Sequence, residues 1–120
     1  MTDVRNLSTA LQTITEAWQP HRLATVNDHD VKVVKLHGEF VWHSHADSDE
    51  LFLIIRGHLV IQLRDGEVHL GPQDVYVVPR GVEHRPVAAE AVEAILIELA
   101  GTVNTGDAGG ELTSRVRELD

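Results

Sequence analysis

No cysteine occurs among the 120 residues of the chain, which excludes disulfides, thiolate nucleophiles and iron–sulfur clusters. Any metal site must therefore use histidine and carboxylate side chains. Basic charge is also scarce, because 10 Lys and Arg stand against 19 Asp and Glu and leave a formal charge of -9. Such a chain lacks the positively charged surface that binds nucleic acids and anionic lipids, so we expect neither a nucleic-acid nor a membrane partner.

Long apolar runs are missing as well. No uninterrupted run of about 18 apolar residues occurs, which is the least that a membrane-spanning helix requires. Residues 1–6 carry neither the basic nor the apolar segment of an export signal, so we expect a cytoplasmic protein. With 42% hydrophobic and 24% charged residues, the composition is that of an ordinary folded chain of one domain, residues 1–120.

Hydrophobic periodicity divides the chain into a helix, a β-rich body and a polar tail. Spacings of three and four predict an amphipathic helix over about residues 3–18, marked by Val4, Leu7, Leu11, Ile14 and Trp18. Thr2 or Asp3 would cap its start, and Pro20 would prevent its continuation. We expect this helix to cover an open side of the core, with a dimer contact as the alternative. The tail, about residues 101–120, is expected to be irregular, with one short turn of helix around 112–119.

Apolar residues alternate with period two from about residue 22 to residue 100, the body of the fold. The alternation predicts short strands over residues 23–26, 31–36, 39–45, 51–55, 59–63, 68–70, 75–78 and 92–99. Turn residues separate them, and the Asp65–Gly66 pair is a strong hairpin signal. The pattern predicts an all-β fold, an antiparallel barrel or sandwich.

Histidine is unusually frequent, with 8 copies, and some of these residues have the spacing of a metal site. His43 and His45 are two apart on a predicted strand, so both imidazoles leave the same face. Glu50 opens the next strand and can face them across a hairpin. Two imidazoles and a carboxylate that converge in this way are ligands for a divalent transition metal. His84, three residues beyond Gly81, is a candidate for a further ligand.

The remaining histidines carry a weaker signal. We expect four of them to be solvated surface groups, because they lie in predicted turns or beside charged residues: His21, His29, His58 and His69.

Two segments resemble the motifs of the cupin family. Residues 38–57, GEFVWHSHADSDELFLIIRG, are similar to the first cupin motif, and residues 71–84, GPQDVYVVPRGVEH, are similar to the second. The chain looks most like small stand-alone cupins of the mannose-6-phosphate-isomerase-like group. The resemblance implies a double-stranded β-helix, or jelly-roll barrel, with an N-terminal helix. It also implies a homodimer through edge strands or the N-terminal helix, with Trp18 or Trp42 as the expected anchor. It also implies a metal set at His43, His45, Glu50 and His84.

The expected site permits more than one function. Four protein ligands leave open positions on a divalent ion such as Zn, Mn, Fe, Ni or Co, so we predict one metal per chain and a small-molecule ligand or substrate. The first hypothesis is a metal-dependent enzyme that acts on a small oxygen-rich substrate by isomerase-, lyase- or dioxygenase-type chemistry, with Glu50 and Tyr76 as candidate catalytic residues. The alternative is a metal-dependent module that binds or senses a small, sugar-like ligand without turnover. A purely structural metal ranks last.

Overall fold

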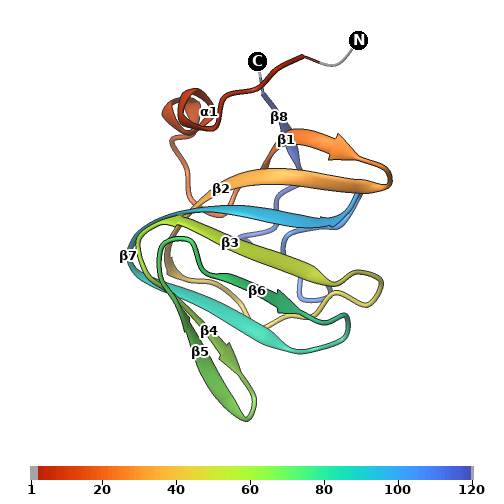
Figure 1. The fold of residues 1–120 in the computed structure, drawn as a ribbon. Coiled ribbons are helices and arrows are strands. Elements are labelled where there is room, and N and C mark those ends of the chain that lie inside the picture. The colour runs from red at the N-terminus through yellow and green to blue at the C-terminus, as the bar shows by residue number, and fades with distance from the viewer. Residues whose placement is uncertain (1–2, 120) are drawn as a thin grey trace.

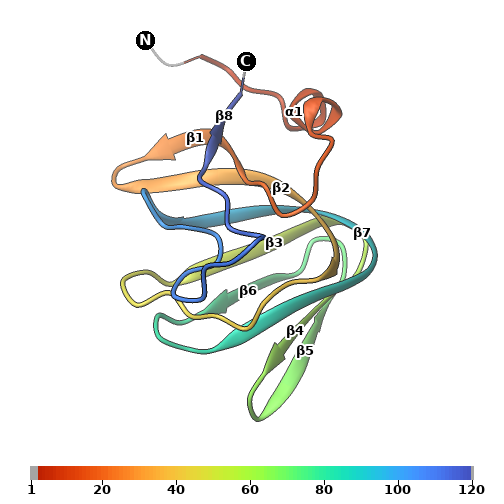
Figure 2. The same cartoon turned by 180° about the vertical axis from the view of Figure 1, so that it is seen from behind.

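The computed structural model describes residues 3–119, which form mainly antiparallel strands. The elements in chain order are α1 (Leu7–Thr13), β1 (His21–Val26), β2 (His29–Glu39), β3 (Glu50–Arg56), β4 (Leu59–Leu63), β5 (Gly66–Leu70), β6 (Val75–Val78), β7 (His84–Leu99) and β8 (Arg117–Glu118). The strands wrap around a common interior, with α1 on the outside near both ends of the described chain and the β4–β5 hairpin projecting at the opposite end (Figures 1 and 2). The fold is the all-β double-stranded β-helix that the sequence predicts.

The long strand β7 joins the two halves of the barrel. On one side it pairs with β2 in antiparallel register from Val87 to Leu99. On the other side its beginning pairs with β4 and its later part pairs with β3. The outer strands β5 and β6 then add to β4 and β3, respectively. A residue at the start of β7, such as His84, is therefore held at the junction of the two halves.

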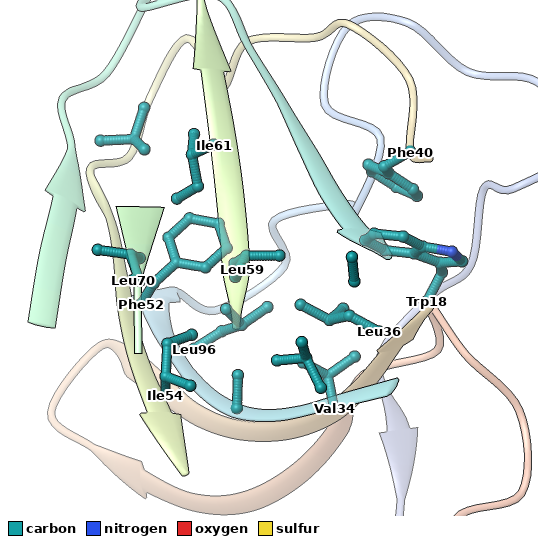
Figure 3. Packing of buried hydrophobic residues seen from close by; sticks show 14 residues of the cluster. Trp18, Val34, Leu36, Phe40, Phe52, Ile54, Leu59, Ile61, Leu70 and Leu96 are labelled. Atoms are coloured by element: carbon teal, nitrogen blue, oxygen red, sulfur yellow. The ribbon is translucent and has the colours of Figure 1, made fainter. Parts of the chain in front are cut away.

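Inward side chains of the alternating strands form the barrel core (Figure 3). The cluster consists of Trp18, Val34, Leu36, Phe40, Phe52, Ile54, Leu59, Ile61, Leu70, Val78, Ala88, Val92, Ala94 and Leu96. Their neighbours in sequence along the strands are mostly more exposed, as the period-two pattern requires.

The N-terminal helix is shorter than the predicted span of 3–18. It begins after Asn6, whose side-chain oxygen accepts a hydrogen bond from the Thr9 amide at 2.9 Å and caps the helix in place of Asp3. Thr2, the other predicted cap, lies outside the described residues. Leu11 and Ile14 pack against Val33 and Ile95 on the outer face of the sheet, so the helix covers this face as expected. No helix in residues 3–119 is long and apolar enough to cross a membrane.

Trp18 belongs to the barrel core and not to the helix. Its backbone has a φ of 65°, a left-handed conformation that is costly for a bulky residue. The surrounding contacts offset this cost: its amide donates to the Lys35 carbonyl at 2.8 Å, and its indole N–H donates to the His37 carbonyl at 3.0 Å. The indole ring also stacks on Phe40 with centroids 4.5 Å apart, as Figure 3 shows. Tertiary contacts therefore override the helical periodicity at this position.

Two further predicted segments differ in the structure. The predicted strand over 39–45 is wrong, because β2 ends at Glu39 and the next ten residues form a loop with a single isolated bridge, between His43 and His84. The tail is irregular as expected, but β8 replaces the predicted helical turn around 112–119 and runs parallel to the start of β1. The salt bridge between Arg22 and Glu118 fastens β8 to β1.

Candidate metal centre

The loop between β2 and β3, residues 40–49, positions two of the predicted metal ligands. Reciprocal backbone hydrogen bonds join it to the start of β7: the His43 amide donates to the His84 carbonyl at 3.1 Å, and the His84 amide donates to the His43 carbonyl at 2.9 Å. The Gly81 amide donates to the His45 carbonyl at 2.9 Å. Glu50, the first residue of β3, follows directly. The loop thus brings His43, His45 and Glu50 together, as the expected strand would have done.

All four predicted ligands come together inside the barrel. One donor atom from each of His43, His45, Glu50 and His84 lies within 4.8 Å of the other three. Their exposed fractions are between 0% and 5%, so water does not solvate the cluster from outside. Three imidazoles and one carboxylate in this arrangement are a donor set for a divalent transition metal.

Backbone carbonyls fix the orientation of two of the imidazoles. Nδ1 of His43 lies 2.9 Å from the carbonyl oxygen of Val41, and Nδ1 of His84 lies 3.0 Å from that of Val82. A carbonyl oxygen only accepts, so each Nδ1 carries the proton and each Nε2 keeps its lone pair for a ligand. Metal-binding histidines in proteins are commonly held by such a hydrogen bond on the far ring nitrogen.

His45 and Glu50 complete the cluster. Oε1 of Glu50 lies 3.2 Å from Nε2 of His84 and 3.5 Å from Nε2 of His45. Neither ring nitrogen of His45 makes a hydrogen bond within residues 3–119, although both are buried. A buried polar atom without a partner is costly and needs an explanation. A metal ion among these four side chains supplies one, so the residues present fit the metal that the motif implies.

The ionisation states of the cluster suit metal binding. Burial lowers the pKa of His43 to about 4, and the neighbouring His84 acts in the same direction. Burial alone would raise the pKa of Glu50, but the imidazoles of His45 and His84 outweigh this effect and hold it below its usual range. A neutral imidazole and an ionised carboxylate are the forms that bind a metal.

A narrow cavity lies beside the cluster. It encloses about 30 Å³, which is room for about one water molecule. His43, Glu50 and Glu98 contribute its charged or ionisable lining. The other lining residues are mainly apolar: Trp18, Pro20, Val34, Leu36, Phe40, Phe52, Pro86, Leu96 and Asn104.

Two charged residues inside the barrel were not found by the sequence analysis. Lys32 and Glu98 are 0% and 1% exposed, and Nζ of Lys32 lies 3.3 Å from Oε2 of Glu98. Burial raises the pKa of Glu98 to about 9, and the nearby Glu50 acts in the same direction. The alternation does contain a signal for them, because each lies two positions from an inward apolar residue, Val34 or Leu96.

Tyr76, the other candidate catalytic residue, lies away from the cavity lining. It is paired with Phe52 across β6 and β3 and packs, partly buried, against the barrel core. The structure therefore brings Glu50, but not Tyr76, to the wall of the cavity.

Comparisons with known proteins define the family. Residues 32–99 match the Cupin domain family, which is more than half of the chain, so the chain belongs to the cupins. It is a small cupin with a buried cluster of metal-ligating side chains.

The relatives include proteins from several bacteria. Uncharacterized protein YdbB of Bacillus subtilis is 36% identical over 86 residues, which cover 71% of this chain and 76% of that protein. A cupin-2 domain containing protein from Shewanella frigidimarina has a similar solved structure, with 42% identity, a TM-score of 0.78, and coverage of 80% of this chain and 94% of that one. Protein NMB1881 from Neisseria meningitidis shares 32% identity with a TM-score of 0.74, over 81% of this chain and 99% of that one.

Proposed function

We propose that the chain is a metal-dependent enzyme that binds one divalent transition metal through His43, His45, Glu50 and His84 and acts on a small oxygen-rich molecule. The buried donor set, with both ring nitrogens of His45 lacking a hydrogen bond, is the observation that supports this proposal most. Zn, Mn, Fe, Ni and Co all accept such ligands. A bound ion would supply Lewis-acid activation of a ligand oxygen, for isomerase- or lyase-type chemistry, or dioxygenase-type chemistry if it is redox-active.

The protein's own groups would orient the ligand and exclude water. The carbonyls of Val41 and Val82 hold two imidazoles in a fixed direction, which limits the reorganisation that a reaction requires. Apolar side chains such as Phe52 and Leu96 line the cavity and keep bulk water from the metal. Glu50 would serve as a ligand, and Glu98 offers a second carboxyl group to the same cavity.

The distribution of cations favours a neutral or weakly anionic substrate over a sugar phosphate. A phosphate dianion needs cationic partners. Arg80, on one side of His84, has a 64% exposed side chain and pairs with Asp49, and Arg85, on the other side, pairs with Glu39. Neither arginine is among the residues that line the cavity. Ligation through a hydroxyl, carbonyl or carboxylate oxygen needs no such cation.

The second candidate is a module that binds or senses a small, sugar-like ligand without turnover. The volume of the cavity favours it, because about 30 Å³ leaves little space for a substrate to change shape unless the surrounding residues move. Turnover separates the two candidates, since both require the metal.

We also propose that the protein is a cytoplasmic homodimer. The edge strand β6 supports the dimer, because Val75 and Val77 are 57% and 43% exposed, and exposed apolar edges are usually covered. Trp18, one expected anchor of the dimer, is buried in the core. The other, Trp42, is covered by Arg64, whose guanidinium carbon lies 3.9 Å from the centre of the indole ring. Light scattering should give twice 13.3 kDa, and a monomeric mass at micromolar concentration would contradict the dimer.

Elemental analysis followed by an activity panel tests the function. The purified protein is expected to contain one divalent transition metal per chain. The metal-loaded protein would then be assayed with unphosphorylated sugars, hydroxy acids and catechol-like compounds, beside mannose 6-phosphate and fructose 6-phosphate. Turnover of the first group supports the enzyme, and binding without turnover supports the alternative. Efficient interconversion of the phosphates that is lost in Arg80→Ala or Arg85→Ala would overturn the charge argument.

A further inference from the structure

One carboxyl oxygen inside the barrel makes no hydrogen bond to any residue from 3 to 119. This atom is Oε1 of Glu98, a residue that is only 1% exposed. The other oxygen, Oε2, lies 3.3 Å from Nζ of Lys32, which fixes the carboxyl group from one side. Glu98 also lines the cavity that borders His43 and Glu50. The free oxygen therefore belongs to a group that is anchored on one side and shares a cavity with two candidate metal ligands.

No described residue donates a hydrogen bond to this oxygen. Several of the other cavity walls, including Leu36, Phe52 and Leu96, are apolar side chains. Leaving a buried carboxyl oxygen unpaired is costly, so such an atom needs a partner or a functional reason. The cavity that Glu98 lines is a place where a bound molecule could pair with this oxygen.

The pairing with Lys32 points in the same direction. Lys32 is itself fully buried, and its only other polar contact in the described chain is a hydrogen bond of 3.4 Å to the carbonyl of Thr102. A buried lysine and glutamate give little net stability compared with apolar residues of similar volume, because both side chains lose their hydration. The pair is thus poorly explained as a packing element, whereas a lysine that orients a ligand-binding carboxyl group accounts for it.

We propose that Glu98 is a specificity-determining residue whose free oxygen hydrogen-bonds a hydroxyl group of the molecule held at the metal, and that Lys32 is the residue that positions it. This inference rests on the proposed metal-binding function and narrows its substrate class. The site would favour hydroxyl-bearing ligands, such as hydroxy acids and polyols, over the same molecules without the hydroxyl. The discrimination arises because a hydroxyl group can donate to or accept from the buried carboxyl group of Glu98, whereas a C–H group can do neither.

The test uses the full chain loaded with Co²⁺, whose visible absorption reports on the ligands of the ion. Glycolate and acetate are titrated separately, because they differ by one hydroxyl group. The ratio of the two dissociation constants measures the preference. We expect this ratio to favour glycolate in the unaltered protein and to fall about tenfold in Lys32→Met/Glu98→Leu, since a tenfold change corresponds to about 1.4 kcal/mol, which one buried hydrogen bond can contribute. Glu98→Gln keeps an acceptor oxygen and should restore part of the preference.

The control is the matched surface pair. Arg64→Met/Glu83→Leu removes an ion pair of 3.2 Å whose side chains are 58% and 55% exposed, and it should leave the ratio unchanged. Should the interior double variant fail to fold by circular dichroism, Lys32→Met alone decides, because loss of the anchor must also lower the ratio.

The outcomes separate this inference from the function on which it rests. Absence of bound Co²⁺ in the unaltered protein overturns the proposed metal site and this inference with it. One Co²⁺ per chain with an unchanged ratio in the interior variants overturns the role of Glu98 alone and leaves the metal site standing. A Co²⁺ spectrum that neither acid changes also overturns the role of Glu98.

Discussion

Two clusters of histidine and glutamate side chains occur among the described residues, and their surroundings differ. The inner group is the buried cluster of His43, His45, Glu50 and His84. The outer group consists of His58, just before β4, with Glu67 and His69 on β5. In the outer group, Nε2 of His58 lies 3.1 Å from Nδ1 of His69, and Nε2 of His69 lies 2.6 Å from Glu67. The side chains of His69 and Glu67 are 55% and 50% exposed.

The difference lies in how the polar atoms are satisfied. The outer groups hydrogen-bond one another and are open to solvent, so nothing in them calls for a ligand. In the inner group, backbone carbonyls occupy Nδ1 of His43 and His84, and the imidazole of His45 makes no hydrogen bond among the described residues. Burial and incomplete pairing, and not residue type, therefore distinguish the candidate metal centre from a solvated surface cluster.

Removal of an inner imidazole should have the largest effect. His45→Ala deletes a direct ligand, and we expect the metal affinity to fall by at least about 100-fold, because even outer-sphere partners of a metal contribute 10–100-fold. Isothermal titration of the metal-free protein measures this loss. His69→Ala is the matched control from the outer group and should bind as the unaltered protein does. Stoichiometric metal in a His43→Ala/His45→Ala double variant would refute the ligand set.

Acid should release the metal, because protons compete for the imidazoles. The folded pKa of His43, about 4, is below that of a free histidine, about 6.5. Its neutral form is thus favoured by folding, and this contribution to stability is present above pH 6.5 and is lost as the pH falls toward 4. We expect the metal to be retained at pH 6 and released by about pH 4.

Dialysis at a series of pH values, followed by elemental analysis, measures this release. Full metal content after dialysis at pH 3.5 would contradict ligation by histidine, whereas complete loss already at pH 6.5 would contradict the protection of His43 by burial.

The contrast between the two groups also explains how much the sequence predicted. The motif spacing predicted that four side chains would converge, and they form one cluster because a loop fixed by the His43–His84 bridge brings them together as a strand would. The period-two pattern similarly predicted most strands. It failed where contacts distant in sequence decide the backbone, as at Trp18, whose hydrogen bonds to β2 end the helical pattern.

Lys32 and Glu98 were missed for a related reason. A charged residue in an alternating strand is ordinarily assigned to the solvent face, and only the register between β2 and β7 shows that both side chains point inward. The partner that makes each burial tolerable is more than 60 residues away in the chain, as the residue numbers show. Sequence periodicity predicts which residues of a strand share a face, but it does not reveal that two buried charged residues on different strands contact each other.

The C-terminal loop offers a way to disturb the inner group from outside the ligand set. Gly106 has a φ of 53°, and a Cβ there would overlap the carbonyl oxygen of Ser44 and lie 3.0 Å from Nδ1 of His45. Gly109 has a φ of 66° with nothing within 4 Å, so Gly109→Ala tests the backbone strain alone. We expect Gly106→Ala to cost about 1–3 kcal/mol more than Gly109→Ala in urea unfolding and to weaken metal binding. Equal stability of the two variants would show that a methyl group at position 106 fits without displacing Ser44 or His45.

The smallest effect is expected from the outer group. His69→Gln removes an exposed imidazole and its contacts with His58 and Glu67. Exposed ion pairs contribute about 0–1 kcal/mol, and surface substitutions usually change stability by less than about 0.5 kcal/mol. The free energy of unfolding in urea and the metal content should therefore match those of the unaltered protein. A loss of half of the bound metal in this variant would mean that the outer group is a second metal site, and that burial is not what separates the two groups.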